Sequence, residues 1–138
     1  MIKIDENQTT IHLTRGDVTN REFNKLAFYC PFYNAETGDE ENYLFTPEDK
    51  ISFVVFEKKG YTKNEVLRKD FTLKEIGYTE PTTHPEIPLD EIDTKQFPLT
   101  NKPKTYWYDV ILNDTATIIG YDEEGAKRII VYPEADEN

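Results

Sequence analysis

The residue types that most often act as nucleophiles or bases are few and scattered in this sequence. It contains one cysteine, Cys30, and two histidines, His12 and His84. A thiol nucleophile needs a general base and a group that orients the base. Cys30 lies in an aromatic-rich segment, residues 28–33, which is typical of a small buried apolar residue. His12 is predicted on the solvent side of a strand and His84 in a loop. We therefore expect no catalytic residues, no cofactor and a protein that is not an enzyme.

Acidic residues form three clusters that could bind a cation or act as paired carboxylates. The clusters lie at residues 39–41, 90–93 and 122–124. A calcium site needs about six to eight oxygen ligands at defined spacings, and none of these clusters has the spacing of a calcium-binding loop. Among 27 acidic residues chance pairs are inevitable, so no pair is singled out for glycoside hydrolysis. We expect solvated turns at these positions and no metal site.

Aromatic side chains are the remaining candidates for a binding role. Tyr29, Tyr33 and Trp107 are the candidate interface residues, because Tyr and Trp are enriched at protein interfaces and can stack on sugars. For Tyr33 and Trp107 a place in the core and a place at the surface both stay open. Phe28 and Phe53 are predicted in the core. Two binding hypotheses follow, an assembly module that contacts other proteins and a carbohydrate-binding module that uses surface aromatics.

The elements that position these residues are predicted to be strands. Thr, Ile, Val, Tyr, Phe and Trp make up 52 of the 138 residues, a bias that favours strands over helices. Apolar patterns predict strands at residues 9–14, 23–33, 51–58, 65–72, 105–112, 117–121 and 127–132. The strand at 51–58 carries apolar residues on both faces and is predicted to be central. Pro31 is expected to end or bulge the strand at 23–33, since proline cannot donate a hydrogen bond to a neighbouring strand.

The segments between the strands carry turn signals. Residues 34–42 are polar and acidic and are predicted to be a loop, and Asn113-Asp114 is a candidate hairpin turn. Residues 77–88 contain one glycine and three prolines, which predicts a long irregular excursion. Residues 89–97 could form a single helical turn capped by Asp90 or Thr94. Short strands without crossover helices predict one all-β antiparallel sandwich, residues 1–138, with its core at 9–132 and an acidic tail at 133–138.

Charge narrows the classes of partner. The chain has 27 acidic and 16 basic residues, a formal net charge of −11. Such a surface repels phosphate backbones and anionic lipid surfaces, so we expect no nucleic-acid partner and no membrane partner. A single cysteine excludes an intramolecular disulfide. The first residues contain no apolar signal segment, so we expect synthesis in the cytoplasm.

Four motifs along the chain carry a family resemblance. They read Ile11-His-Leu-Thr-Arg-Gly-Asp17, Thr46-Pro-Glu-Asp-Lys-Ile-Ser-Phe53, Ile87-Pro-Leu-Asp-Glu-Ile-Asp-Thr94 and Thr105-Tyr-Trp-Tyr-Asp-Val-Ile-Leu112. In this order they resemble the N-terminal immunoglobulin-like domain of baseplate upper proteins, among phage and prophage structural proteins of Gram-positive hosts. The resemblance covers about residues 9–132.

This resemblance implies a specific fold and role. The fold would be a single immunoglobulin-like β-sandwich of about seven to nine strands with one short helical turn. The protein would be a non-enzymatic virion structural protein of a baseplate, tail or capsid decoration, located in the virion. Its partners would be other virion proteins, and it would be a homo-oligomer or present in many copies per particle. The family implies no catalytic residues.

Overall fold

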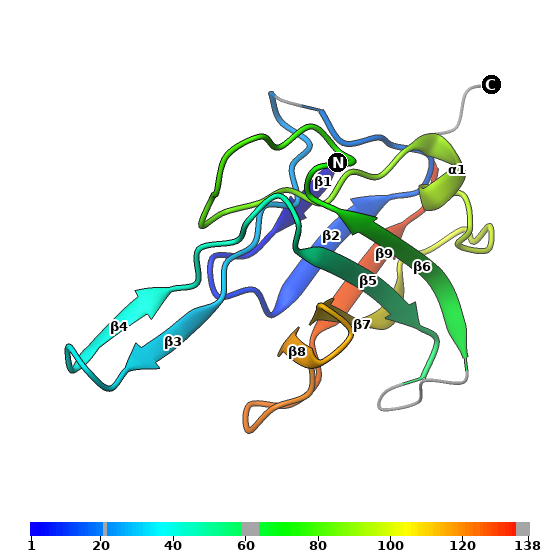
Figure 1. Ribbon diagram of the computed structural model, residues 1–138. Helices are drawn as coiled ribbons and strands as arrows, with labels where there is room; N and C mark the ends of the chain where they lie inside the picture. The colour runs from blue at the N-terminus through cyan, green and yellow to red at the C-terminus, as the bar shows by residue number, and fades with distance from the viewer. Residues whose placement is uncertain (21, 59–63, 135–138) are drawn as a thin grey trace.

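The computed structural model describes residues 1–20, 22–58 and 64–134, and in this part of the chain the protein is almost entirely β (Figure 1). The all-β prediction is confirmed. The elements in chain order are β1 Ile2–Ile4, β2 Thr10–Thr14, β3 Pro31–Asn34, β4 Asp39–Asn42, β5 Lys50–Phe56, β6 Glu65–Thr72, α1 Glu91–Thr94, β7 Lys104–Leu112, β8 Ala116–Ile119 and β9 Arg128–Tyr132.

Seven of the strands form one twisted sheet. Its order is β1-β2-β9-β7-β5-β6, and β8 pairs with β7 beside this path. All of its pairs are antiparallel except β2 with β9, which run parallel. The expectation of a purely antiparallel arrangement is therefore wrong at this pair. Parallel neighbours need a long connection, and nearly the whole chain lies between β2 and β9, so their direction is not restricted by a tight turn.

The core lies on one face of this sheet. β7 alternates as predicted, with Tyr106, Tyr108 and Val110 each about 1% exposed on the inner face. β5 is buried along both of its faces, as its pattern predicted, and it lies one place from the edge strand β6. Phe53 is fully buried. Burial of each such side chain contributes roughly 1.5–3 kcal/mol, which makes these two strands the centre of the core.

Three irregular segments cover the inner face and form a second layer. They are residues 24–30, 43–46 and 82–89, and they bury Phe28 and Phe45 against the sheet. Isolated antiparallel bridges join Ala27 to Glu86 and Phe45 to Thr82. The predicted irregular excursion at 77–88 is confirmed, because it contributes bridges but neither a helix nor a strand. Its prolines interrupt any longer ladder.

Two predictions in this part of the chain are wrong. The strand expected at 23–33 does not form, and a strand begins only at Pro31. Residues 24, 26 and 28 are buried in alternation, but their partner segment around Pro85 cannot continue a ladder. The loop expected at 34–42 is instead the end of β3, a turn and β4.

The local turn predictions are confirmed. Asp90 caps α1, and its side chain and that of Asp93 form a reciprocal capping box. Asn113 and Asp114 both have positive φ, 51° and 59°, and join β7 to β8 as a hairpin turn of the type that matches strand twist. These short signals fix the start of α1 and the turn between β7 and β8.

Candidate interaction surface

The feature most open to a partner is a β-hairpin that projects from the body of the protein (Figure 1). We call residues 31–42, comprising β3, β4 and their turn, the arm, and the other described residues the body. Among the residues that the structure describes, β3 and β4 pair only with each other. All four residues of β4 and the first three of β3 are exposed. The arm therefore presents two strand edges and both of its faces to solvent.

The arm forms because its turn residues supply the required chemistry. The Asn34 side chain accepts a hydrogen bond from the backbone of Glu36 at 3.0 Å. Gly38 donates its N–H to the Asn34 carbonyl at 2.8 Å and has φ +77°, a conformation that favours glycine. Pro31 begins β3, a position that proline tolerates in an edge strand. The turn thus closes the hairpin by local bonds alone.

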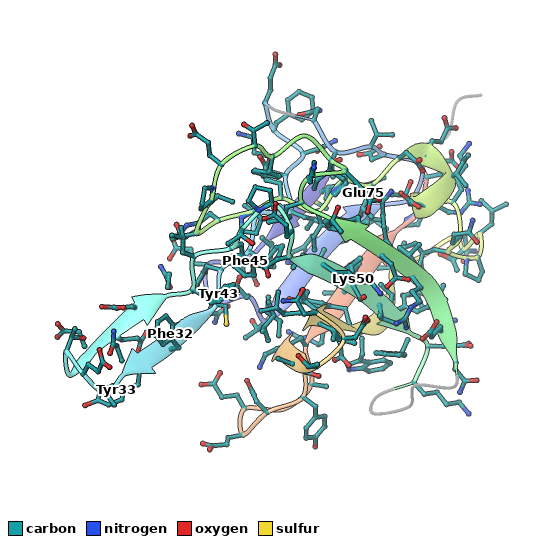
Figure 2. All side chains as sticks on the ribbon, in the orientation of Figure 1. Phe32, Tyr33, Tyr43, Phe45, Lys50 and Glu75 are labelled. Atoms are coloured by element: carbon teal, nitrogen blue, oxygen red, sulfur yellow. The ribbon has the colours of Figure 1, made fainter. Side chains whose placement is uncertain are left out.

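Each face of the arm carries one aromatic ring and at least one carboxylate, because Asp39 shares the face of Glu41. Phe32 lies opposite Glu41 and Tyr33 lies opposite Glu40 in the register of the two strands. Successive residues of a strand point to opposite faces, so Phe32 and Tyr33 lie on different sides. Phe32 is 42% exposed and Tyr33 69%. Figure 2 shows both residues on the projecting hairpin, apart from the body.

The arm is strongly and uniformly acidic. It contains Glu36, Asp39, Glu40 and Glu41 and has neither lysine nor arginine. Within the described part of the chain, none of these four carboxylates forms an ion pair with a cation. The one side-chain bond to them comes from the Asn34 amide, which donates to Glu41 at 3.1 Å. Their charge is therefore left for a partner or for solvent ions.

The chain enters the arm from residues 29–30, which we call its first root, and Tyr29 holds this root to the body. Its hydroxyl donates to the Glu6 carbonyl at 2.7 Å, and its backbone is held by the side chain of Gln8. Tyr29 is half-buried. This predicted interface residue is thus used within the fold, as a support for the arm.

The chain leaves the arm at Tyr43, which we call its second root, and the contacts of Tyr43 hold this root to the body. Its N–H donates to the Cys30 carbonyl at 2.8 Å, and its hydroxyl donates to Asp49 at 3.1 Å. Desolvation, together with the hydrogen bond and charge of Asp49, raises the pKa of Tyr43. Its ring packs edge-on against Phe45 at 4.8 Å between centroids, and both rings lie where the arm meets the body in Figure 2. The arm therefore starts from two fixed positions.

Trp107 lies on a different part of the protein. It is half-buried on the outer face of β7, opposite Phe56 of β5 and Arg128 of β9. Tyr33 belongs to the separate two-stranded sheet of the arm. The structure therefore does not combine the three predicted interface residues into one surface. Tyr33 alone among them is largely exposed.

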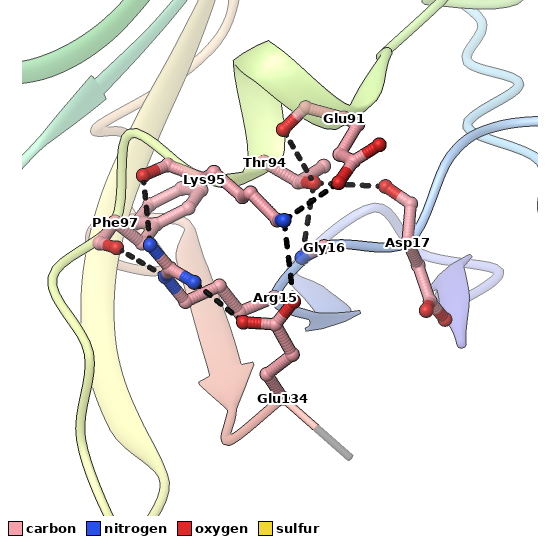
Figure 3. A network of polar contacts seen from close by, with 8 residues as sticks. All are labelled: Arg15, Gly16, Asp17, Glu91, Thr94, Lys95, Phe97 and Glu134. Atoms are coloured by element: carbon pink, nitrogen blue, oxygen red, sulfur yellow. Dashed lines mark hydrogen bonds and ion pairs between the residues drawn. The ribbon is translucent and has the colours of Figure 1, made fainter. Parts of the chain in front are cut away.

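Two of the sequence motifs meet in a polar network beside α1 (Figure 3). The Thr94 hydroxyl accepts from the Gly16 N–H at 3.1 Å and donates to the Asp17 carbonyl at 2.9 Å. The Arg15 guanidinium donates to the Phe97 carbonyl at 2.7 Å and pairs with Glu134 at 2.6 Å. These residues therefore lock the turn after β2, the helical turn and the segment after β9 together.

The other two motifs meet along β5 and β7, where Ile51 pairs with Leu112, and Asp49 also bonds Asn113, the residue that follows the fourth motif. The Asn113 amide donates to Asp49 at 2.9 Å, and its oxygen accepts from the Lys50 N–H at 2.8 Å. Asp49 also accepts from the backbone of Thr46 at 2.8 Å. This contact joins the turn before β5 to the end of β7. All four motifs thus act as joints of the fold.

The residues with nucleophile or base chemistry are engaged separately. Burial raises the pKa of the Cys30 thiol, which favours its neutral form. The His12 ring nitrogen lies 3.0 Å from the Tyr132 hydroxyl, and His84 contacts the Thr83 hydroxyl at 2.9 Å. The described residues contain no cluster of His, Cys, Asp and Glu that could hold a metal ion.

The described surface also has a depression of about 550 Å³, lined in part by Lys25, Tyr78 and Glu86.

The structure also contains supports that sequence reasoning missed. Gln8 and Arg15 bond to segments far along the chain, and no periodic pattern marks such contacts. The arm left a local signal, because Asn34 and Gly38 are turn formers between Phe32-Tyr33 and Asp39 to Asn42. The polar and acidic composition of residues 34–42 favours a loop and masks this signal.

Comparison with protein-family models, with curated proteins and with solved structures gives no match for this chain. Within the described residues, no helix is long and apolar enough to cross a membrane.

Proposed function

We propose that this chain is a non-enzymatic structural protein of a bacteriophage virion. In this proposal it is an immunoglobulin-like assembly module of a baseplate, a tail or a capsid decoration, and it docks on other virion proteins. The observation that carries the proposal is the arm, residues 31–42, which leaves two aromatic rings and two strand edges exposed. Exposed edges and aromatic side chains are the features that protein interfaces use.

The motifs of the family resemblance support this role. The motifs contact one another in pairs, as the bond of Thr94 with Gly16 and the strand pairing of Ile51 with Leu112 illustrate. Residues that hold turns together are expected to recur in a scaffold that is reused for different docking surfaces. The resemblance thus concerns the scaffold, and the arm, which lies outside the four motifs, supplies the docking surface.

The layered arrangement supports an immunoglobulin-like sandwich. The large sheet forms one layer, and the bridged segments 24–30, 43–46 and 82–89 form the other. An immunoglobulin-like sandwich packs two sheets around a shared core, and here isolated bridges hold the second layer in the place of a second sheet. The prolines of the second layer explain why its pairing is limited to isolated bridges.

The proposal is tested by protein composition of the particle. Virions encoded by the same phage or prophage genome are purified and analysed by quantitative mass spectrometry. We expect the chain in intact particles at a fixed, multiple copy number relative to the major capsid protein. Its absence from purified particles would refute the proposal. Cosedimentation of the purified protein with separated capsids and tails then identifies the component, since a decoration protein binds capsids and a baseplate protein binds tails.

A carbohydrate-binding module is the second candidate. The observation that favours it is Trp107, half-exposed on the outer face of β7 two residues from the carboxylate of Asp109. An indole face beside an acceptor can bind a sugar by stacking and hydrogen bonding. Saccharide titration followed by tryptophan emission separates the two candidates, because binding at this site changes the environment of the only tryptophan.

A further inference from the structure

We propose that the arm inserts into a groove lined by lysine or arginine on a different protein of the same particle, and that a strand of this partner pairs with an edge of the arm. This inference deepens the proposed assembly role and rests on it for the identity of the partner. It specifies the docking surface, the charge of the partner and the geometry of the contact.

The distribution of the aromatic rings determines the geometry. Phe32 and Tyr33 lie on opposite faces of the arm, and both are substantially exposed. A flat partner surface would bury only one of them. A groove that contacts both faces removes both rings from water. Burial of each ring then stabilises the complex in proportion to the apolar area buried. The arm is therefore shaped for insertion.

The unpaired charges determine the chemistry of the partner. Four carboxylates lie within twelve residues, and Glu41 and Glu40 stand across from the two rings. A groove that surrounds the arm must compensate these charges, because burial of an unpaired carboxylate is strongly unfavourable. Lysine or arginine in the groove would supply that compensation and would speed the encounter.

A second copy of this chain fits the arm poorly. The whole chain carries a net charge of −11, of which the arm contributes only −4, so the body is itself net negative. Two copies repel each other, and this repulsion favours a partner of opposite charge. The partner is therefore a different protein.

The edges of the arm supply the remaining contact. β3 and β4 each pair on one side only, so each has an outer edge of free N–H and C=O groups. A hairpin of two strands is only marginally stable by itself in water. A third strand, contributed by the partner, would pair these groups and stabilise the arm.

The first test uses the full chain and a defined probe. The probe is a synthetic peptide in which lysine and valine alternate, and its charge-reversed control has glutamate in place of lysine. Binding is followed by amide chemical shifts of the isotope-labelled protein. We expect the lysine peptide alone to bind, with the largest shifts in residues 31–42. Absence of binding, or shifts spread over the body, would overturn the inference.

A matched pair of variants separates the arm from general acidity. The arm variant carries Glu36→Gln, Asp39→Asn, Glu40→Gln and Glu41→Gln, and the control variant carries Glu22→Gln, Glu48→Gln, Glu123→Gln and Glu124→Gln. The control residues are all exposed and lie in the body. We expect the arm variant to bind the lysine peptide roughly ten-fold more weakly than the control variant. Equal affinities would exclude the arm as the site.

The particle experiment distinguishes the failure of this inference from that of the proposed function. The wild-type chain, the arm variant and the control variant are each cosedimented with the capsid or tail fraction. We expect the wild type and the control variant to bind and the arm variant to be lost. If all three bind equally, the arm inference fails while the assembly role stands. If none binds, the assembly role fails. Light scattering measures the mass of the wild type and of the arm variant. If the wild type is a dimer and the arm variant is not, a second copy of the chain binds the arm, and the choice of partner is wrong.

Discussion

The side chain of Gln8 pairs with the main chain of Tyr29 in both directions, as a neighbouring strand would. Gln8 Nε2 donates to the Tyr29 carbonyl at 2.9 Å, and the Tyr29 N–H donates to Gln8 Oε1 at 2.7 Å. Gln8 is only 7% exposed, and its own carbonyl accepts from the Tyr108 hydroxyl at 2.7 Å. The turn after β1 is thereby fixed both to the core and to the root of the arm.

Replacement of Gln8 tests this anchor. The Gln8→Ala variant leaves the N–H and the carbonyl of Tyr29 without protein partners, so we expect a loss of about 2 kcal/mol in the free energy of unfolding. Urea denaturation measures this loss. Gln96→Ala is the control, because Gln96 is exposed and its amide bonds only the Ile92 carbonyl. The control should change stability by less than about 0.5 kcal/mol. Equal effects of the two variants would contradict the anchoring role.

Arg15 is predicted to be irreplaceable by lysine. Its guanidinium bonds the Phe97 carbonyl, the Lys95 carbonyl and Glu134 from one planar group (Figure 3). A lysine ammonium cannot match three acceptors arranged around a fork. We expect Arg15→Lys to lower the free energy of unfolding by about 2 kcal/mol. The same substitution at the exposed Arg68 should cost less than about 1 kcal/mol. Thermal unfolding of Arg15→Lys and Arg68→Lys, each compared with wild type, measures the two losses, and equal losses would contradict this role of Arg15.

Asp109 is predicted to destabilise the fold at neutral pH. Burial raises the pKa of this carboxyl above its ordinary value of 3.8, because the described residues give it no hydrogen-bond partner against desolvation. The folded state then binds more protons than the unfolded state just above pH 3.8, so stability falls as pH rises through this range. Asp109→Asn should therefore be more stable than wild type at neutral pH, and the gain should vanish in acid. A gain that stays constant with pH would refute this origin. Denaturant titrations across the pH range provide the measurement.

Asp70 is predicted to have the opposite pH dependence. The Ser52 hydroxyl donates to it at 2.5 Å, and this bond, together with the charge of Arg68, lowers the pKa of Asp70. A lowered pKa stabilises the folded state above the unfolded value, and the stabilisation is lost as pH falls through the folded value. Asp70→Asn should therefore be less stable than wild type at neutral pH and converge with it in acid. The same titrations apply, and a deficit that persists in acid would argue against the charge.

Tyr33 is predicted to be dispensable for folding. Its ring is 69% exposed on the arm, so Tyr33→Ser should change the free energy of unfolding by less than about 0.5 kcal/mol. Phe28→Ala provides the contrast, because Phe28 is buried in the core and its truncation should cost about 3–5 kcal/mol. Calorimetry of both variants tests the pair. A large loss for Tyr33→Ser would assign the ring a structural role and weaken its case as a contact residue.

Much of the fold could be predicted where the pattern is local. β7 was predictable because Tyr106, Tyr108 and Val110 recur with the period of a strand that has one buried face. Asp90 was predictable as a cap, and Asn113-Asp114 as a hairpin turn, because each acts on its immediate neighbours. The same reasoning failed at residues 24–30, where the alternation is present but the partner segment contains Pro85.

The candidate site was less predictable. Tyr33 was a candidate from its residue type, but its exposure depends on the arm, which stands apart from the body in Figure 1. Tyr29 and Trp107 carry the same residue-type signal, but Tyr29 supports the arm and Trp107 lies on the large sheet. Residue type signals an affinity for interfaces, but it does not tell which aromatic side chains share a surface.

The sequence by itself determined the strand-rich composition, the positions of most strands, the capped helical turn and the charge of −11. These follow from side-chain sterics and from interactions over a few residues. Only the tertiary structure decided that β2 and β9 run parallel, that Gln8 replaces a strand beside Tyr29, and that the acidic segment projects as a hairpin. Such contacts join residues far apart along the chain, where the gain comes from burial and from pairing of polar groups once the whole core has formed. No local period encodes them.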